Sequence, residues 1–204
     1  MDRSDKMRRR ILDYAQQQFA TVGYSNVSTA QFAYDLKMSK STFYKYFASK
    51  EELLFAVIDD FYRVFEQEVI GIMEDEKTDI TEKVQLFLVA VRRRFSQLQV
   101  SVVEDIRRAV PEAYTHLEEG RKRMITGTLV QLFEQGVKDG VIRSDIPPVI
   151  ISGVLLQAIQ YLEHPEVLSE LSFTYAEVFP KVFSVVMEGS LTEEGRERIH
   201  TGGA

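Results

Sequence analysis

The chain has 204 residues, of which 45% are hydrophobic and none is cysteine. That length and hydrophobic content allow a sizeable core and exclude a disordered chain, while the lack of cysteine excludes a disulfide framework and a thiolate metal site and fits a reducing cytoplasm. Neither a signal peptide nor a membrane span is predicted, because residues 1–10 are charged throughout and the longest uncharged run, residues 146–162, contains prolines and glutamines.

The net charge of −6 is divided unevenly along the chain. Residues 1–50 hold nine Lys and Arg against four Asp and Glu, a net charge of +5. The remaining 154 residues hold 16 against 27, a net charge of −11. Because DNA attracts a basic surface and repels an acidic one, this division predicts a basic N-terminal module that binds DNA and an acidic body that does not.

The first predicted helix spans residues 2–22 and ends at Gly23, a residue type common just after a helix. Its apolar residues recur at helical spacing, and basic residues crowd its beginning. These basic residues are Arg3, Lys6, Arg8, Arg9 and Arg10. Such a cluster alone is more often a solvated surface, but ahead of a DNA-binding motif we expect it to contact phosphates.

A helix-turn-helix is predicted next. Ser28, followed three residues later by Gln31, predicts an N-cap with a capping box and therefore the start of a short helix. Residues 37–39 have room only for a tight turn. Ser39 can then cap a second short helix over residues 40–46.

The second helix of this pair has two different faces. At helical spacing Phe43 and Phe47 point the same way, toward a core. The opposite face is small, hydroxylated and basic, and consists of Ser41, Thr42, Tyr44 and Lys45. Hydroxyl and ammonium groups can reach phosphates or base edges in a major groove, and a tyrosine ring can contact a thymine methyl group. This face is therefore a candidate for reading DNA.

A second capping box, Ser49 with Glu52, predicts a long amphipathic helix that runs to about residue 75. Lys50 lies in its first turn, where a positive charge opposes the helix dipole. We expect a cation in that position to lie beside a phosphate.

These residues resemble the tetracycline-repressor (TetR) family of bacterial transcription regulators. The resemblance covers roughly the first 55 residues. The matching positions are Ile11-Leu12 with Phe19, Gly23-Tyr24, Ser28-Thr29, Phe32-Ala33, Ser39-Lys40, Thr42-Phe43-Tyr44, Tyr46-Phe47 and Ser49-Lys50-Glu51-Glu52-Leu53. Two positions differ from the family pattern, since Lys37 and Ser41 stand where glycine is common. Either Lys37 adopts the left-handed conformation that glycine adopts freely, or the turn is slightly different.

The body is also predicted to be helical, over residues 79–98, 100–109, 111–138, 147–162 and 173–188. The expected fold class is all-α, with about nine helices. An N-terminal three-helix helix-turn-helix DNA-binding domain is expected over residues 1–52, a helical ligand-binding and dimerisation domain over residues 53–190, and a frayed polar tail over residues 191–204.

The resemblance implies a DNA-binding transcriptional regulator, and it assigns the DNA contacts to particular positions. Those carried over from the family are Thr29, Lys40, Ser41, Thr42, Tyr44, Tyr46 and Lys50. Ser28 and Lys45 are added from the geometry of the two short helices. The implied target is a palindromic double-stranded DNA operator bound by a homodimer.

The resemblance further implies a dimer formed by residues 147–162 and 173–188, and an effector site in the body. The candidates for the dimer seam are Gln157, Tyr161, Phe179 and Phe183. The candidates for a pocket that takes a small, largely apolar effector are Phe87, Val91, Phe95, Met124, Leu129, Phe133, Leu156 and Tyr161. Ordinary core is the commoner role of each pocket candidate. No cofactor and no membrane partner are expected.

An enzyme is not predicted, because no catalytic or metal-binding motif is found and the three histidines, His116, His164 and His200, are isolated. The adjacent pair Glu104-Asp105 is expected to be solvated. A second hypothesis stays open: a helical dimerising or ligand-carrying protein without DNA binding, in which the aromatic residues of the short helices only pack.

Overall fold

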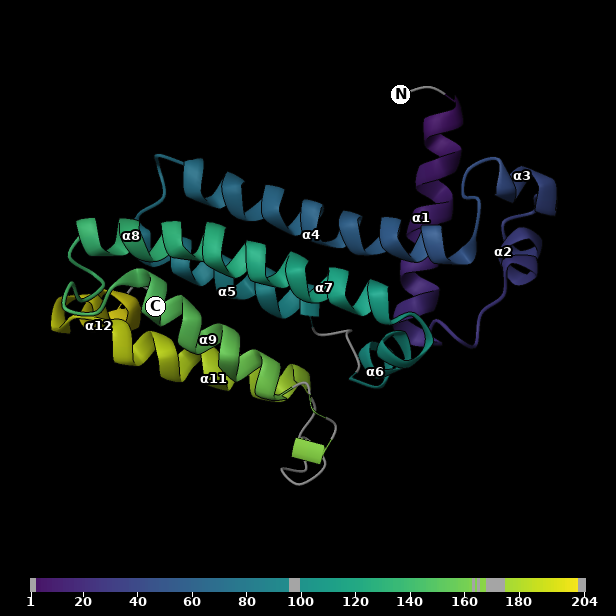
Figure 1. The fold of residues 1–204 in the computed structure, drawn as a ribbon. Helices are drawn as coiled ribbons and strands as arrows, with labels where there is room; N and C mark the ends of the chain where they lie inside the picture. Colours follow the sequence, from purple (N-terminus) through teal and green to yellow (C-terminus); the bar gives the residue numbers. More distant parts are fainter. Residues whose placement is uncertain (1–2, 96–99, 163, 165, 168–174, 202–204) are drawn as a thin grey trace. The chain divides into compact units, whose positions relative to one another are not determined.

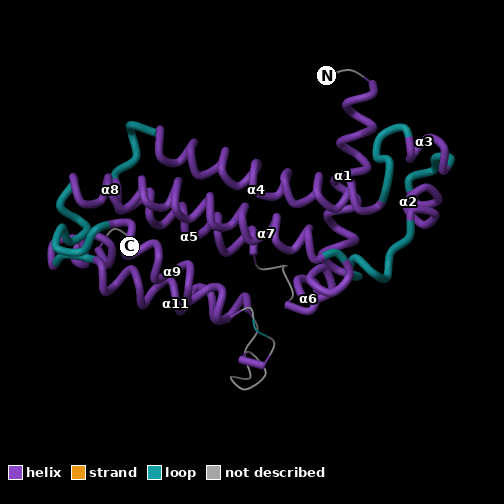
Figure 2. The backbone as a smooth tube through the Cα atoms, in the orientation of Figure 1, coloured by secondary structure: helices purple, strands orange, loops and turns teal. Residues whose placement is uncertain are grey.

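The computed structural model describes residues 3–95, 100–162, 164, 166–167 and 175–201. These residues form helices joined by turns (Figure 2), and the only extended pairing among them is an isolated bridge between Ile142 and Leu191. The predicted all-α fold class is confirmed. Among the described helices, none is both long enough and apolar enough to cross a membrane.

The helices follow one another along the chain as labelled in Figure 1. They are α1 (Arg3–Thr21), α2 (Thr29–Asp35), α3 (Lys40–Tyr44), α4 (Lys50–Glu74), α5 (Ile80–Phe95), α6 (Val100–Ala109), α7 (Pro111–Met124), the π-helical turn η1 (Ile125–Leu129), α8 (Val130–Lys138), α9 (Pro148–Leu162), α11 (Tyr175–Ser190) and α12 (Glu193–Thr201). The single helix expected over residues 111–138 is therefore interrupted by a π-helical turn.

The chain forms two compact units. Unit 1 comprises Met1–Tyr62 and Gln97–Gly120, and unit 2 comprises Arg63–Ser96 and Arg121–Ala204. Helices α4 and α7 each contribute residues to both units. The division differs from the expected boundary, because α6 and most of α7 belong to the unit that contains the helix-turn-helix.

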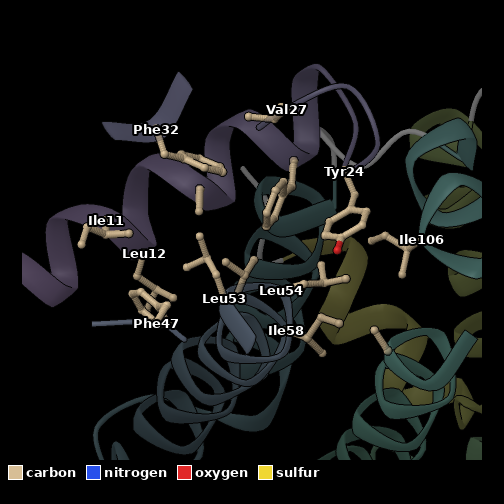
Figure 3. Close-up of a cluster of buried hydrophobic side chains, with 14 of the residues drawn as sticks. Ile11, Leu12, Tyr24, Val27, Phe32, Phe47, Leu53, Leu54, Ile58 and Ile106 are labelled. Atoms are coloured by element: carbon tan, nitrogen blue, oxygen red, sulfur yellow. The ribbon is translucent and has the colours of Figure 1, made fainter. Parts of the chain in front are cut away.

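The core of unit 1 is built around the ring of Phe32, which is completely buried (Figure 3). Phe32 meets Phe19 of α1 edge to face at a centroid distance of 5.7 Å and stacks on Phe43 of α3 at 6.0 Å. Aromatic pairs in these geometries add to the free energy gained by burying apolar area. Since Phe32 lies on α2, this one side chain fixes the two short helices against α1.

Helix α6 completes this core from a distant part of the sequence. Val102 and Ile106 are buried in the same cluster as the helix-turn-helix residues. The first part of α7 is also held closely, because Tyr62 donates a hydrogen bond of 2.9 Å to the carbonyl of Leu117 and its ring covers Gly120. A Cβ on Gly120 would lie 2.5 Å from Tyr62 Cδ2, so only glycine allows this approach.

Unit 2 packs α9 against α11, η1 and α8, and α5 against α8, α11 and α12. Its interior is joined by aromatic contacts, since Phe87 of α5 lies 6.2 Å from Phe65 and 5.6 Å from Phe183 between ring centroids. Residues 178, 183 and 187 of α11 are buried, and together they form the buried face of an amphipathic helix. The helix continues through Pro180.

The segment expected to be a frayed tail instead contains α12. Thr192 caps this helix, because its Oγ1 accepts a hydrogen bond of 2.9 Å from the Gly195 amide and donates one of 2.7 Å to the carbonyl of Gly140. Gly195 packs so closely that a Cβ would lie 2.2 Å from the carbonyl oxygen of Val141. The packing of this helix could not be predicted from the polar composition of the segment, because it depends on contacts with the backbone of residues 140 and 141.

Gly195→Ala is expected to lower the free energy of unfolding by about 1–3 kcal/mol, because the added methyl group meets a backbone carbonyl that cannot rotate away. Gly71→Ala is the matched control: Gly71 also lies within a helix, and nothing is within 4 Å of its Cβ position. At position 71 alanine should raise the free energy of unfolding by up to about 1 kcal/mol, because alanine has a higher helix propensity than glycine. Urea unfolding of both variants checks this, and equal stabilities would contradict the contact.

Candidate functional site

Helix α2 begins at Ser28, which has an extended backbone and whose Oγ accepts a hydrogen bond of 3.1 Å from the Gln31 amide. The predicted N-cap is confirmed, but the capping box is only half formed, because the Gln31 side chain donates to Asp35 at 2.9 Å instead. Asp35 also accepts a hydrogen bond of 2.6 Å from Tyr14 of α1. The hydrogen bonds from Tyr14 and Gln31 lower the pKa of this carboxyl group.

The turn between α2 and α3 contains Lys37 in the left-handed conformation, with φ at 55°. The Met38 amide donates to the carbonyl of Ala33 at 2.9 Å, which closes the end of α2. Of the two possibilities that the sequence leaves open, the left-handed lysine is therefore correct. A side chain in this conformation costs roughly 1–2 kcal/mol.

Helix α3 begins at Ser39, whose Oγ accepts a hydrogen bond of 3.1 Å from the Thr42 amide and lies 2.8 Å from the hydroxyls of Ser41 and Thr42. Phe43 and Phe47 are buried, which confirms the predicted inward face. Lys40, Ser41, Tyr44 and Lys45 are exposed, whereas Thr42 and Tyr46 are half-buried. The helix itself ends at Tyr44, two residues before the predicted end.

Lys50 opens α4 and has a partner within the protein. Its Nζ lies 4.0 Å from the centroid of the Tyr24 ring, a cation–π contact. Partial burial lowers the pKa of Lys50, and the nearby carboxylate of Asp105 opposes that shift. The side chain is half-buried, so its ammonium group remains within reach of solvent or a ligand.

An open hollow on unit 1 brings together four of the nine predicted DNA contacts, Ser28, Thr29, Tyr44 and Lys50. Thr29 Oγ1 lies 3.1 Å from the Tyr44 hydroxyl, so the start of α2 and the end of α3 meet there. The other five, Lys40, Ser41, Thr42, Lys45 and Tyr46, lie outside the hollow. All nine are exposed or half-buried, and their contacts with DNA stay a prediction.

The basic residues at the start of α1 do not share one environment. Arg9 pairs with Asp13 at 2.6 Å and with the buried Asp60 at 2.7 Å, so it is engaged within unit 1. Arg8 is exposed and its guanidinium carbon lies 4.9 Å from the centroid of the Phe47 ring. Arg8 is therefore a better candidate for a phosphate contact than Arg9.

Sequence reasoning missed Asp105 of α6, which it assigned to a solvated pair with Glu104. Asp105 accepts a hydrogen bond of 2.8 Å from the Ser25 amide and a second from the Ser25 hydroxyl. Glu104 binds Arg107 and Arg108 at 2.6–2.8 Å, which lowers its pKa to about 2. Because 80 residues separate Ser25 from Asp105, no local pattern could reveal this tie between α6 and the loop before α2.

Comparison with known proteins identifies the same motif. Residues 11–57 match a sequence model described as bacterial regulatory proteins, tetR family. The chain thus carries the N-terminal helix-turn-helix of the tetR family. It is a DNA-binding transcriptional regulator and not an enzyme, which sets aside the alternative of a helical protein without DNA binding.

Similarity to other proteins extends beyond the matched motif. The uncharacterized HTH-type transcriptional regulator YvaF of Bacillus subtilis (strain 168) is 24% identical over 159 residues, which cover 78% of this chain and 83% of that protein. A transcriptional regulator from Saccharomonospora viridis, in complex with choline, shares the fold with a TM-score of 0.71 at 19% identity, covering 93% of this chain and 100% of that one. The reduced form of Escherichia coli NemR shares the fold with a TM-score of 0.71 at 17% identity, and the match covers 92% of this chain and 97% of that one.

Unit 2 contains a small, largely apolar cavity. Four of the eight predicted pocket residues line it, namely Phe87, Val91, Met124 and Leu129. Phe133 and Leu156 are buried outside the lining, Tyr161 is 63% exposed, and the Phe95 side chain lies outside the described residues. Lining residues that sequence reasoning did not propose are Val69, Arg121, Ile125, Thr128, Leu155, Ile159 and Phe183.

Helix α9 carries an exposed stripe opposite its buried face. Its members are Ile150, Val154, Gln157 and Tyr161, of which the three apolar ones are 54–63% exposed. On α11, Val185 is 73% exposed. Two of the predicted seam residues, Gln157 and Tyr161, lie on this stripe. Phe183 does not lie on an exposed face because it is fully buried and lines the cavity, and the Phe179 side chain lies outside the described residues.

Lys50→Ala is expected to weaken binding to all DNA sequences alike and to flatten the salt dependence of log K by about 0.9 per subunit, as loss of one phosphate contact does. Lys50→Arg should retain the slope. Lys138→Ala is the matched control, since Lys138 is an exposed lysine of unit 2. Fluorescence anisotropy at several salt concentrations measures the slopes, and an unchanged slope for Lys50→Ala would refute the phosphate role.

Asp105→Ala is expected to lower the free energy of unfolding by about 1–2 kcal/mol, because two hydrogen bonds to a half-buried carboxylate are lost. Glu119→Ala provides the comparison, as Glu119 is an exposed acidic residue of the same unit. Thermal and urea unfolding report the difference. If both variants unfold alike, the hydrogen bonds from Ser25 to Asp105 do not stabilise the protein.

Proposed function

We propose that this regulator binds a near-palindromic operator as a homodimer, represses transcription there, and is released by a small, largely apolar effector. One observation carries the proposal: the exposed hydroxyl and basic groups of α3 lie opposite its buried aromatic face, beside Lys50 at the start of α4. A short helix held by aromatic packing can enter a major groove with its outward side chains free.

The nine candidate contacts divide by chemistry. Lys40 and Lys50 carry charge for phosphates, and their contribution is independent of sequence. Ser41 and Lys45 are the candidates for altering base preference, because both are exposed, Ser41 on α3 and Lys45 at the C-cap of that helix. The remaining contacts, Ser28, Thr29, Thr42, Tyr44 and Tyr46, offer hydroxyl groups that can donate to phosphate oxygens.

A homodimer accounts for the exposed stripe of α9. Val154 and Tyr161 are 55% and 63% exposed, and they repeat with helical spacing along a helix whose other face is buried. Two copies packed through α9 and α11 across a twofold axis would form a four-helix bundle and cover this stripe. A twofold dimer presents two copies of α3, so half-sites about one helical turn apart or somewhat more are expected.

The effector is assigned to the cavity of unit 2. A bound molecule alters DNA affinity only if it prefers one of two conformations. Val69 of α4 and Met124 of α7 line the cavity, and both helices also contribute residues to unit 1. A displacement of these helices by the effector would therefore change how the two copies of α3 are held.

Val154→Asp is expected to convert the dimer into a monomer and to lower operator affinity at least about tenfold, because a charge would be buried without a partner and the second half-site contact would be lost. Val89→Asp is the control, since Val89 is 61% exposed on α5. Light scattering at micromolar concentration gives the mass, and gel shifts on genomic fragments give the affinity. A monomeric wild-type protein that binds DNA fully would refute the proposed dimer.

Repression and release are tested by transcription in vitro from a promoter that contains the footprinted operator. The protein should inhibit the reaction, and an effector found by thermal shift should restore it. If compounds that raise the melting temperature never change operator affinity, the cavity is not regulatory.

A further inference from the structure

Two hydroxyl groups in the interior of unit 2 have no hydrogen-bond partner among the described residues. Ser152 of α9 is fully buried, and its Oγ makes no hydrogen bond there. Thr128 of η1 is 7% exposed and lines the cavity, and its hydroxyl is likewise without a bond to the described part of the chain. A buried hydroxyl group that has lost its hydrogen bonds to water costs free energy. Such groups are uncommon in native cores, and a bound water or ligand is a common reason for them.

Other helical hydroxyl groups of unit 2 make the bond that these two lack. Thr126 donates to the carbonyl four residues before it at 2.8 Å, and Ser190 does the same at 2.6 Å. This is the usual hydrogen bond of a serine or threonine within a helix. Because Ser152 and Thr128 do not make it, both hydroxyl groups can bond to a ligand.

The two hydroxyl groups lie along one wall. Leu155 and Ile159 of α9 line the cavity, and Ser152 comes three residues before the first and seven before the second, on the same face of the helix. Ser152 is outside the lining, one helical turn further along α9. A cavity that lengthens along this helix therefore extends from Thr128 toward Ser152.

The cavity offers no unpaired charge to a ligand. Arg121 is the one charged residue of the described lining, and it already has a partner within the protein. Apart from Thr128, the other lining residues are apolar. A charged ligand would leave water for this wall without gaining a new partner of opposite charge, which is costly. The wall therefore suits a neutral molecule.

We propose that this cavity binds a neutral molecule with an apolar body and one or two hydroxyl or carbonyl oxygens. One oxygen bonds to the Thr128 hydroxyl, and the apolar body lies among Phe87, Ile125 and Leu155. In a longer ligand a second oxygen bonds to Ser152. This assignment rests on the proposed function, since it names the chemical class of the effector.

The cavity is too small to receive such a ligand without movement. Its volume of about 20 Å³ has room for about one water molecule. The ligand must therefore push lining residues apart, and these residues come from α4, α5, α7, η1, α9 and α11. The turn η1 is π-helical, a conformation that is rare and is often found at functional sites. Ligand binding and a change of conformation are thus inseparable at this site, which is what release of an operator requires.

The first test compares ligands that share a body and differ in the polar group. Ethylbenzene, 2-phenylethanol, acetophenone, phenylacetate and 2-phenylethylammonium are titrated into the full-length protein by calorimetry, with octan-1-ol and octan-2-one to vary the body. The neutral ligands should bind, and the two charged ones should not. Thr128→Val is expected to weaken binding of 2-phenylethanol and acetophenone at least about fivefold, because one hydrogen bond is lost. The same substitution should leave the affinity for ethylbenzene unchanged within about twofold, since that ligand has no polar group.

Ser152 is tested with a ligand that has a hydroxyl group at each end, 2-(4-hydroxyphenyl)ethanol. Ser152→Ala should weaken its binding at least about threefold and leave the affinity for 2-phenylethanol unchanged. Thr126→Val and Ser190→Ala are the matched controls, because each removes a helical hydroxyl group that already has a partner outside the lining. Both controls should leave every affinity unchanged.

The stability of the free protein separates a binding role from a structural one. Thr128→Val and Ser152→Ala each remove a hydroxyl group without a partner, so each should raise the melting temperature by about 2–4 °C. The controls Thr126→Val and Ser190→Ala remove a hydrogen bond and should not raise it. A lower melting temperature for both Thr128→Val and Ser152→Ala would show that these hydroxyl groups stabilise the core, which would reject the site.

Three binding results would also overturn the assignment: a charged ligand binding as tightly as 2-phenylethanol, no neutral ligand of the series binding, or Thr126→Val acting like Thr128→Val. Operator gel shifts with each ligand separate this from the proposed function. Release by charged ligands alone would keep the effector site and reject the neutral class. Binding of 2-phenylethanol through Thr128 without any change in operator affinity would keep the neutral site and reject its regulatory role.

Discussion

The packing of Phe32 between Phe19 and Phe43 is the interaction on which the DNA-binding unit depends. Helix α2 has seven residues and α3 has five, and helices of that length are not stable alone in water. Burial of their aromatic side chains against α1 supplies the free energy that their own hydrogen bonds do not. The inward aromatic residues therefore hold the short helix rigidly, and this leaves the hydroxyl and basic residues of the opposite face free for contacts.

Helix α6 adds a tertiary constraint to this arrangement. Its apolar residues join the same core, and Asp105 holds the loop that leads to α2 through Ser25. The same carboxylate opposes the lowering of the Lys50 pKa that burial causes, and Lys50 lies over Tyr24. A residue from the middle of the chain thus influences both the geometry and the electrostatics of the candidate DNA contacts.

The sequence predicted what depends on near neighbours. The caps at Ser28 and Ser39 and the inward side of α3 each follow from residues within a few positions, and the structure agrees with them. For Lys37 the sequence left two possibilities, and the structure has the left-handed one. Contacts between distant segments could not be predicted in this way. The tie from Asp105 to Ser25 is the clearest case, because each residue alone has the composition of a solvated surface.

Contacts between distant segments also explain why the roles of two residues of unit 2 were not predicted from the sequence. Phe183 was expected at a dimer seam, but the hydrophobic periodicity of α11 does not say which partner covers each face. Arg121 was not proposed for the cavity, since an arginine followed directly by two other basic residues is usually exposed. Only the packing of α5, η1, α9 and α11 brings its guanidinium group into an apolar wall.

The π-helical turn η1 also bears on how this protein can change over evolution. A turn of this kind contains one residue more than the α-helical turn it replaces, so it represents an insertion that the helix absorbs locally. Deleting one residue there would restore a continuous α-helix in which the residues before and after the turn keep their faces. The cavity wall would then change only at the turn itself, which contributes Ile125, Thr128 and Leu129. A single-codon insertion or deletion could thus alter ligand preference without altering the fold.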